Sequence, residues 1–338
     1  MRRYLYGLAA GVVGTLLLLV GGIQALSLVA PQHMPAPAIS RLDHLDEKLQ
    51  FLRQHPGLDP RVLAVGSSIT WRQFDGAAFA HLAGGGSHVL NGGTAFLKTH
   101  QTQFVTDFYL KQFRNVHTLV QVTNVPDFRR CNSEPAEMFD PTDAAAYAFK
   151  GEPALLFYLR YFAPVRYLRT LKDLPEQRRL GSGELALDDY GAGPIGGTPG
   201  TTQKARGLFY GRIAVERDCL EPLVALARQA AGRGIRYVVV FAPVHPGYFQ
   251  RYPDMREETV ALAGALRQRL APLGGLVLEM QEAPGYASAD FYDAFHLHWP
   301  AVRRFSAEVA DRLGHTLSVG LPPVVPPQEA ELAAHRGR

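Results

Sequence analysis

The chain has 338 residues, a formal net charge of +4 and an apolar fraction of 47%. Its basic residues are scattered, as in the separate pairs Arg129-Arg130 and Arg303-Arg304, and the sequence lacks the dense basic stripe of a nucleic-acid-binding protein. A chain of this length can bury a sizeable core, so we expect one large domain and no nucleic-acid partner.

The N-terminal segment is long and apolar. Residues 4–30 contain no charged side chain, and this run exceeds the roughly 20 residues that a helix needs to cross a bilayer. Arg2 and Arg3 precede it, and the next Lys or Arg is Arg41. Because positive residues stay on the cytoplasmic side, we predict a single-pass anchor over residues 1–31, with the rest of the chain extracytoplasmic or periplasmic.

A cleaved signal peptide is the alternative interpretation of this segment. Ala25-Leu26-Ser27 has the small residues of a cleavage site. The apolar region of a signal peptide, however, usually has only about 7–15 residues. The length of the run therefore favours an uncleaved anchor.

Residues 32–58 predict a linker and an amphipathic helix. The linker is proline-rich, which stiffens a chain. Leucines then recur every three or four positions, as in one face of a helix, at Leu42, Leu45, Leu49 and Leu52. We expect this apolar stripe to pack on the domain that follows.

Short apolar runs alternate with helical patterns through residues 59–317. The runs that predict strands are 62–65, 88–90, 118–122, 237–241 and 276–278. The longest helical patterns between or after them are 96–113, 221–233 and 257–270. This alternation predicts an α/β domain with a parallel sheet covered on both faces. Ligands of such folds bind beyond the carboxyl ends of the strands.

An insertion over residues 129–207 separates the third and fourth predicted strands. Its first part, 154–168, mixes aromatics, leucines and arginines in one helical pattern. That helix either lies on the membrane surface or packs on the domain with its arginines reaching solvent. Its second part, 181–202, is rich in Gly, Pro and Thr and predicts a loop or lid. Residues 318–338 predict a proline-rich, polar tail.

Two motifs far apart in the sequence supply a serine, an aspartate and a histidine. Gly66-Ser67-Ser68 directly follows the first predicted strand, and Asp293 and His296 precede a helical pattern over residues 300–313. A serine hydroxyl needs a histidine to take its proton and an acid to orient that histidine. Each motif alone also fits a helix cap or a chance pair. Their shared context predicts Ser68 as nucleophile, His296 as base and Asp293 as orienting acid.

These motifs resemble the SGNH/GDSL hydrolase superfamily over roughly residues 60–315. Ser68 falls on the serine of that family's Gly-Asp-Ser block, and Ser67 replaces the aspartate. Asp293 and His296 match its last block, Asp-x-x-His. The resemblance implies an α/β three-layer sandwich with a central parallel sheet and chemistry through an acyl-serine intermediate. The Gly-Ser-Ser variant is also similar to extracytoplasmic acyl-transfer proteins.

The resemblance also implies an oxyanion hole. The family's glycine is matched by Gly93, after the run Val89-Leu90-Asn91-Gly92, and its asparagine is matched by Asn124. The third block departs from the family's Gly-x-Asn-Asp, because the glycine is missing and Pro126 intrudes. This block is therefore the weakest part of the match.

Two further histidines and two cysteines have open interpretations. His245 follows the fourth predicted strand, where it either contacts substrate or lies in a solvated loop. His298 competes as the base, although the Asp-x-x-His spacing favours His296. Cys131 and Cys219 either form a disulfide or stay separate thiols. No spacing of these residue types predicts a metal site or a cofactor.

The expected function is that of a serine esterase or O-acyltransferase acting on acyl esters, acetyl esters above all, of a cell-envelope polysaccharide. The triad does not distinguish hydrolysis from transfer, since water or a sugar hydroxyl can take the acyl group. One alternative is an inactive accessory or glycan-binding subunit of a membrane acyltransferase. Another is a lipase-like esterase at the bilayer. The expected partners are an acylated glycan or other ester, the lipid bilayer and, in the accessory interpretation, a membrane-bound acyltransferase.

Overall fold

The computed structural model describes residues 2–30, 33–80, 88–181, 183–196 and 211–318. Five parallel strands form one sheet in the order β2-β1-β3-β4-β5. The strands are β1 (Val62–Ala64), β2 (Val89–Asn91), β3 (Thr118–Thr123), β4 (Arg236–Phe241) and β5 (Leu276–Glu279). Almost every residue of β1 to β4 is buried, so both faces of the sheet are covered. The predicted α/β class and parallel sheet are confirmed.

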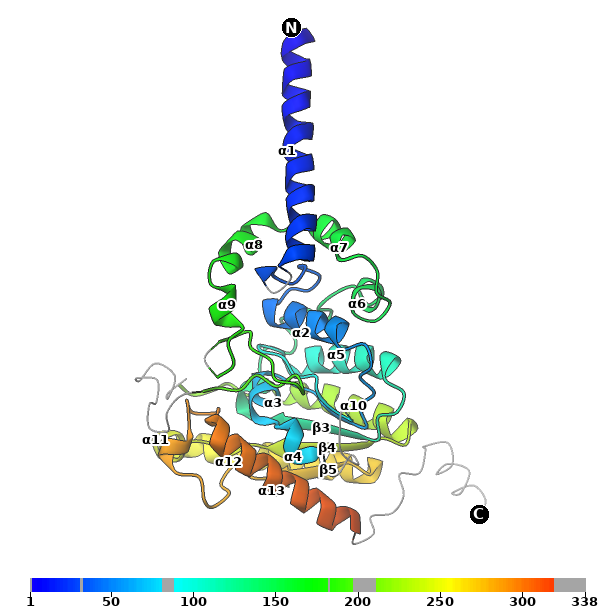
Figure 1. The fold of residues 1–338 in the computed structure, drawn as a ribbon. Coiled ribbons are helices and arrows are strands. Elements are labelled where there is room, and N and C mark those ends of the chain that lie inside the picture. Colours follow the sequence, from blue (N-terminus) through cyan, green and yellow to red (C-terminus); the bar gives the residue numbers. More distant parts are fainter. Residues whose placement is uncertain (1, 31–32, 81–87, 182, 197–210, 319–338) are drawn as a thin grey trace, which may run out of the picture.

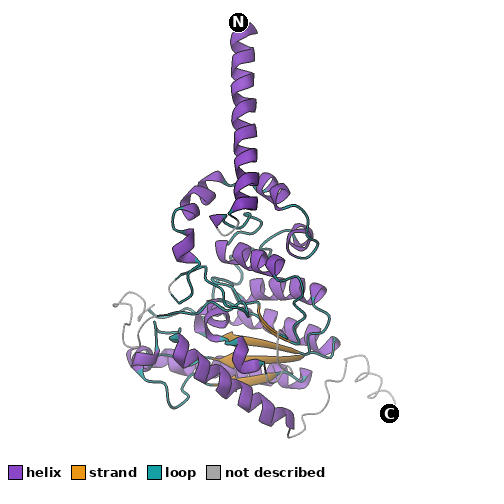
Figure 2. Cartoon of the chain, in the orientation of Figure 1, coloured by secondary structure: helices purple, strands orange, loops and turns teal. Residues whose placement is uncertain are grey.

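Helices surround this sheet in the view of Figure 1 and carry most of the chain outside it (Figure 2). The helices packed around the sheet are α3 (Ser68–Gln73), α4 (Gly76–Phe79), α5 (Thr99–Gln112), α10 (Leu220–Gly232), α11 (Pro246–Arg251), α12 (Pro253–Leu270) and α13 (Trp299–Ser318). Helix α10 packs against both α5 and α12, and α13 packs against α3 and α4. The long helices begin and end within a few residues of the predicted patterns.

The strand order places three candidate site residues at one edge of the sheet. From β1 the chain first adds β2 on one side and then returns to add β3 on the other. In open α/β sheets the crevice where this order reverses is the usual ligand site, beyond the carboxyl ends of the strands. Ser68 follows β1, Gly93 follows β2 and Asn124 follows β3.

Helix α1 (Arg2–Val29) projects away from the rest of the protein (Figure 1). Its span Arg2–Leu26 is long and apolar enough to cross a membrane, and none of its most apolar window is buried inside the protein. A core helix of this composition would be buried. Helix α2 (Asp43–Gln54) lies between α1 and the sheet and buries the predicted leucine stripe, including Leu45 and Leu49.

The insertion after β3 forms α6 (Pro141–Ala148), α7 (Ala154–Arg160), α8 (Pro164–Leu171) and α9 (Leu174–Gln177). The single helix expected over residues 154–168 is therefore two helices. Pro164 is the first residue of α8, a position that suits proline because its missing N–H would have no partner there. Ion pairs fasten the insertion to α2, since Arg166 pairs with Asp43 and Asp46.

Residues 183–196 form neither a helix nor a strand, as expected of a loop, but they pack against the domain, which corrects the expectation of a lid for this part of residues 181–202. Lys48, fully buried on α2, donates to the carbonyl oxygens of Asn91 and Gly191. Asp188 Oδ1 accepts from the N–H groups of Tyr190 and Ala192, 2.9 and 2.8 Å away. These bonds hold the segment against α2 and the end of β2. The rest of the expected lid, residues 197–202, and nearly all of the expected tail lie outside the described residues.

A disulfide joins Cys131 and Cys219, with their Cα atoms 5.5 Å apart. It links the segment that follows β3 to the start of α10. The sequence left this pairing open because spacing alone does not give the distance between two cysteines.

Candidate active site

The turn between β1 and α3 presents Ser68 at the edge of the sheet. Gly66 has φ +146°, and a Cβ there would lie 2.2 Å from Thr70 Oγ1, so only glycine fits. Ser67 caps α3, since its Oγ accepts from Ile69 N at 3.1 Å. Thr70 Oγ1 lies 2.7 Å from the Val122 carbonyl and accepts from Val122 N. These contacts fix α3 between β1 and β3 and leave Ser68 partly exposed.

Ser68, His296 and Asp293 meet as a hydrogen-bonded chain. His296 Nε2 lies 3.1 Å from Ser68 Oγ, and His296 Nδ1 lies 2.8 Å from Asp293 Oδ2. A neutral imidazole with its proton on Nδ1 would donate to Asp293 and accept from the serine hydroxyl. This is the geometry that general-base activation of a hydroxyl requires. The three predicted residues are therefore in the predicted contact.

Asp293 is held as an anion. The residue is 4% exposed, and its Oδ1 accepts from the N–H groups of Phe295 and His296, each at 2.8 Å. Burial opposes the charged form, but the charge of His296 and these hydrogen bonds outweigh it, so the pKa of Asp293 lies below its ordinary value. An ionised Asp293 would orient the His296 ring and stabilise its protonated form.

Gln73 clamps the histidine loop to the nucleophile helix. Its Nε2 donates to the Phe295 carbonyl at 2.8 Å, and its Oε1 accepts from Leu297 N at 3.3 Å. Gln73 is fully buried at the end of α3, the helix that starts at Ser68. The amide therefore sets the position of His296 relative to Ser68. Sequence analysis missed it, since nothing in the residue pattern points to this long-range pair.

The two predicted oxyanion residues are both tied to other groups. Gly93 N donates to Asn91 Oδ1 at 3.0 Å, and the Asn91 amide donates in turn to carbonyls of α3. Asn124 is fully buried, its Nδ2 donates to the Ala242 carbonyl at 2.9 Å and its Oδ1 accepts from Val125 N. An amide nitrogen carries two hydrogens, so this one bond leaves Asn124 a second donor. The oxyanion role of both residues stays a prediction.

A buried acid lies beside Ser67, at the position where the resembling family has an aspartate. Asp127 accepts from Thr123 Oγ1 at 2.8 Å and from the Ser67 side chain. Burial raises the pKa of Asp127 to about 6, although these bonds and the charges of Lys98 and His296 act in the opposite direction. Asp127 is the last residue of the 3-10 turn Val125–Asp127, which follows β3, so a carboxyl reaches Ser67 from that turn. Sequence analysis did not single out Asp127, because only the fold brings it next to Ser67.

His245 and His298 do not contact Ser68 in any described hydrogen bond. His245 is buried, and its Nδ1 accepts from Gly247 N at 2.9 Å, which caps α11. Burial lowers its pKa, with Asp293 acting against that shift. The substrate contact predicted for His245 remains a prediction beside this capping role. His298 is buried with its ring edge-on to Tyr292 at 5.9 Å, so His296 is the histidine in reach of Ser68.

An aromatic residue stands exposed on the loop that follows Gly93. Phe96 has φ +68°, which is unusual for a side chain other than glycine, and its side chain is 66% exposed. Its ring lies edge-on to His44 at 5.5 Å, and His44 lies edge-on to Trp71 on the nucleophile helix at 5.2 Å. Strained backbone of this kind concentrates at ligand sites. The same loop is tied to the serine turn by Thr94 N, which donates to the Gly66 carbonyl at 3.1 Å.

No protein-family model matches the chain, and no curated protein matches its sequence. Over the described residues, no group of three or more His, Cys, Asp or Glu side chains could hold a metal ion. The site is therefore interpreted from its own geometry.

Proposed function

We propose that the chain is a serine esterase or O-acyltransferase that works through an acyl-serine at Ser68. The observation that carries this proposal is the 3.1 Å contact between His296 Nε2 and Ser68 Oγ, with Asp293 on the other ring nitrogen. His296 takes the serine proton as Oγ attacks the acyl carbonyl. The ester C–O bond then breaks, and His296 gives the proton to the leaving alcohol. Water or a hydroxyl acceptor then takes the acyl group, and the proton again passes through His296.

We further infer that the sheet is the centre of a three-layer sandwich of the SGNH/GDSL type. Support comes from the strand order and from the positions of Ser68 after β1 and of Asp293 and His296 just before α13. One departure from the family's blocks, Ser67 in place of an aspartate, has a counterpart in the structure. Asp127 stands beside Ser67 and supplies the carboxyl that the nucleophile block lacks.

The proposed substrate is an acyl ester, acetyl above all, of a cell-envelope polysaccharide outside the cytoplasm. An apolar N-terminal helix that begins with Arg2 and Arg3 supports a single-pass anchor with the domain outside. The disulfide between Cys131 and Cys219 fits an oxidising compartment. The exposed Phe96 ring offers an apolar surface of the kind that stacks on the face of a sugar ring.

A second candidate function is an inactive accessory or glycan-binding subunit of a membrane acyltransferase. The observation that favours it is the bond from Gly93 N to Asn91 Oδ1, which occupies a donor that oxyanion stabilisation would need. In this interpretation the protein binds a glycan, and Ser68, His296 and Asp293 catalyse no ester turnover.

Ester turnover by the full chain in detergent separates these functions. Chromogenic acetyl esters and long-chain esters are offered in parallel, each with and without an added polysaccharide acceptor. The proposal expects turnover of the acetyl ester, with acyl groups appearing on the polysaccharide if transfer is the reaction. A preference for long chains would indicate the lipase-like alternative. No turnover of any ester would leave the accessory subunit as the better interpretation.

A further inference from the structure

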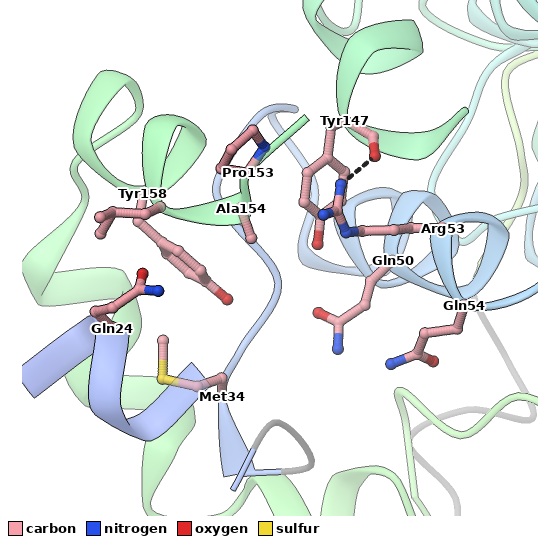
Figure 3. A pocket seen from close by; sticks show the side chains of 10 residues that line it. Gln24, Met34, Gln50, Arg53, Gln54, Tyr147, Pro153, Ala154 and Tyr158 are labelled. Carbon is pink, nitrogen blue, oxygen red and sulfur yellow. Dashed lines mark hydrogen bonds between the residues drawn. The ribbon is translucent and has the colours of Figure 1, made fainter. Parts of the chain in front are cut away.

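A cavity of about 420 Å³ lies at the foot of α1 and is lined in part by α2 (Figure 3). Helix α2 itself lies between α1 and the sheet (Figure 1). Side chains from α1, α2, the end of α6, α7 and the linker between α1 and α2 line the cavity, among them Gln24, Met34, Gln50, Arg53, Tyr147 and Tyr158. The side chains of Gln50 and Gln54 extend into it from α2 (Figure 3). If α1 crosses a membrane, this cavity lies at the level of the lipid headgroups.

Arg53 gives the cavity a positive charge that the protein does not neutralise. Its Nη1 donates to the Tyr147 carbonyl at 2.7 Å, and its guanidinium lies over the Tyr147 ring. The nearby carboxylates of α2 have other partners, since Asp43 and Asp46 pair with Arg166 and Glu47 pairs with Arg178. Among the described residues, no carboxylate pairs with Arg53. A guanidinium group without a carboxylate partner can bind a phosphate through two parallel hydrogen bonds.

Gln50 adds a requirement for a hydrogen-bond donor. Its side chain is 9% exposed, and its Oε1 has no hydrogen-bond partner within the described parts of the chain. A buried acceptor without a partner costs free energy that a ligand donor would recover. A ligand that carries both a phosphate and a hydroxyl would satisfy Arg53 and Gln50 together.

Gln24 lines the cavity from α1, and apolar lining comes from Met34, Ala154 and Leu155. Helix α7 contacts α1, and α7 and α8 flank the foot of α1 in Figure 1. These helices and their connection expose large apolar side chains, at Leu156, Leu159, Phe162 and Val165. Exposed apolar side chains next to a membrane helix fit the boundary between headgroups and acyl chains. Acyl chains of a bound lipid would lie along α1 and α7.

We propose that this cavity binds the headgroup of an anionic phospholipid that carries a hydroxyl. The phosphate contacts Arg53, the hydroxyl donates to Gln50 Oε1, and the acyl chains remain in the bilayer. The bound lipid holds α2, and with it the domain, in a fixed orientation to the membrane. This inference rests on α1 crossing the membrane and is independent of the chemistry at Ser68.

The test uses the full chain, purified in detergent, stripped of lipid and then given phosphatidylglycerol or phosphatidylcholine. Native mass spectrometry counts the lipids that stay bound. The variants are Arg53→Gln, Gln50→Glu and, as a matched control on α10, Arg228→Gln. Gln50→Glu places a carboxylate at the cavity wall while keeping the size of the side chain, so it serves if Arg53→Gln fails to fold.

We expect one phosphatidylglycerol to be retained in preference to phosphatidylcholine. Arg53→Gln and Gln50→Glu should each weaken retention about tenfold, which corresponds to about 1.4 kcal/mol, and Arg228→Gln should not. Free glycerol 3-phosphate at equal concentration should fail to displace the lipid. Equal retention in all variants, or no preference for phosphatidylglycerol, would overturn the proposal. Full displacement by glycerol 3-phosphate would overturn the proposal of a lipid ligand and indicate that the cavity binds a soluble phosphate compound.

Discussion

The triad and the predicted oxyanion hole sit at the same edge of the sheet but are built differently. Ser68, His296 and Asp293 contact one another, and Gln73 holds their two segments together. Gly93 and Asn124 instead bond to groups within the protein. The Ser68 hydroxyl is thus in contact with the histidine that would activate it, whereas the donors that would stabilise an oxyanion are occupied at least in part.

The two sets of contacts support different steps of the proposed reaction. Proton transfer from Ser68 needs only the contacts already formed. Stabilising the tetrahedral intermediate needs donors aimed at the oxyanion, and Gly93 must first exchange its bond to Asn91 for one to substrate. Asn124 has a second amide hydrogen and needs no such exchange.

The largest effect is expected from Ser68→Ala. Removing the nucleophile of a triad should lower kcat for acetyl-ester hydrolysis by roughly 10³-fold or more. Ser67→Ala is the matched control, since Ser67 caps α3 and bonds Asp127 but does not contact His296 in the described structure. It should keep part of the activity. Steady-state kinetics on purified protein measure both, and full activity in the Ser68 variant would exclude it as nucleophile.

Asn124→Ala tests whether the Asn124 side chain serves the oxyanion. If the second amide hydrogen serves the oxyanion, kcat should fall about 10²- to 10³-fold. If the side chain is only structural, the main loss should be in stability, roughly 1–3 kcal/mol from the unpaired Ala242 carbonyl and Val125 N–H. Kinetics and denaturant unfolding on the same preparation separate the two. A normal kcat in the folded variant would remove Asn124 from the proposed hole.

Gln73→Leu tests whether the position of His296 relative to Ser68 matters, since the variant leaves all three triad residues in place. Loss of both amide bonds frees the loop that carries His296, and a misplacement of about 1 Å can cost up to about 10²-fold in rate. We expect kcat to fall by roughly 10- to 100-fold with little change in KM. Gln250→Leu, an exposed glutamine on α11, is the control. An unchanged pH profile and rate in Gln73→Leu would show that the clamp does not position His296.

The smallest effect is expected from Asp127, in the way that the free energy of unfolding depends on pH. Its folded pKa of about 6 lies above the ordinary 3.8, so the folded chain holds this proton more tightly. The resulting stability is full below pH about 4 and is lost as pH rises to about 6. The free energy of unfolding should therefore fall by roughly 1–3 kcal/mol between pH 4 and pH 7 through this group. In Asp127→Asn this contribution to the difference should be absent. The exposed Asp311→Asn should keep the wild-type difference, and an identical pH dependence in Asp127→Asn would contradict the account.

Local patterns predicted much of this fold. The strands and long helices follow from apolar runs and their periodicity, as in residues 118–122 and 257–270. The Asp-x-x-His spacing predicted a contact that the fold then makes with Ser68. The expected helix over residues 154–168 was wrong in one respect, because the start of a second helix at Pro164 outweighed the continuous apolar pattern.

Long-range pairs could not be predicted in the same way. Gln73 reaches Phe295, and Asp127 reaches Ser67, only because α3, the end of β3 and the histidine loop converge at one edge. Packing of residues 183–196 depends on Lys48, whose burial lowers its pKa to about 7. A composition rich in Gly, Pro and Thr gives no sign of that contact.

If Ser68 is an activated nucleophile, it should react with an electrophile that labels such serines covalently. The full chain is treated with a fluorophosphonate probe, and intact mass and peptide mapping locate the adduct. We predict one adduct on Ser68 in the wild type and in Ser67→Ala, slower labelling in His296→Ala and none in Ser68→Ala. No adduct on the folded wild-type protein, or an adduct that persists in Ser68→Ala, would contradict the account.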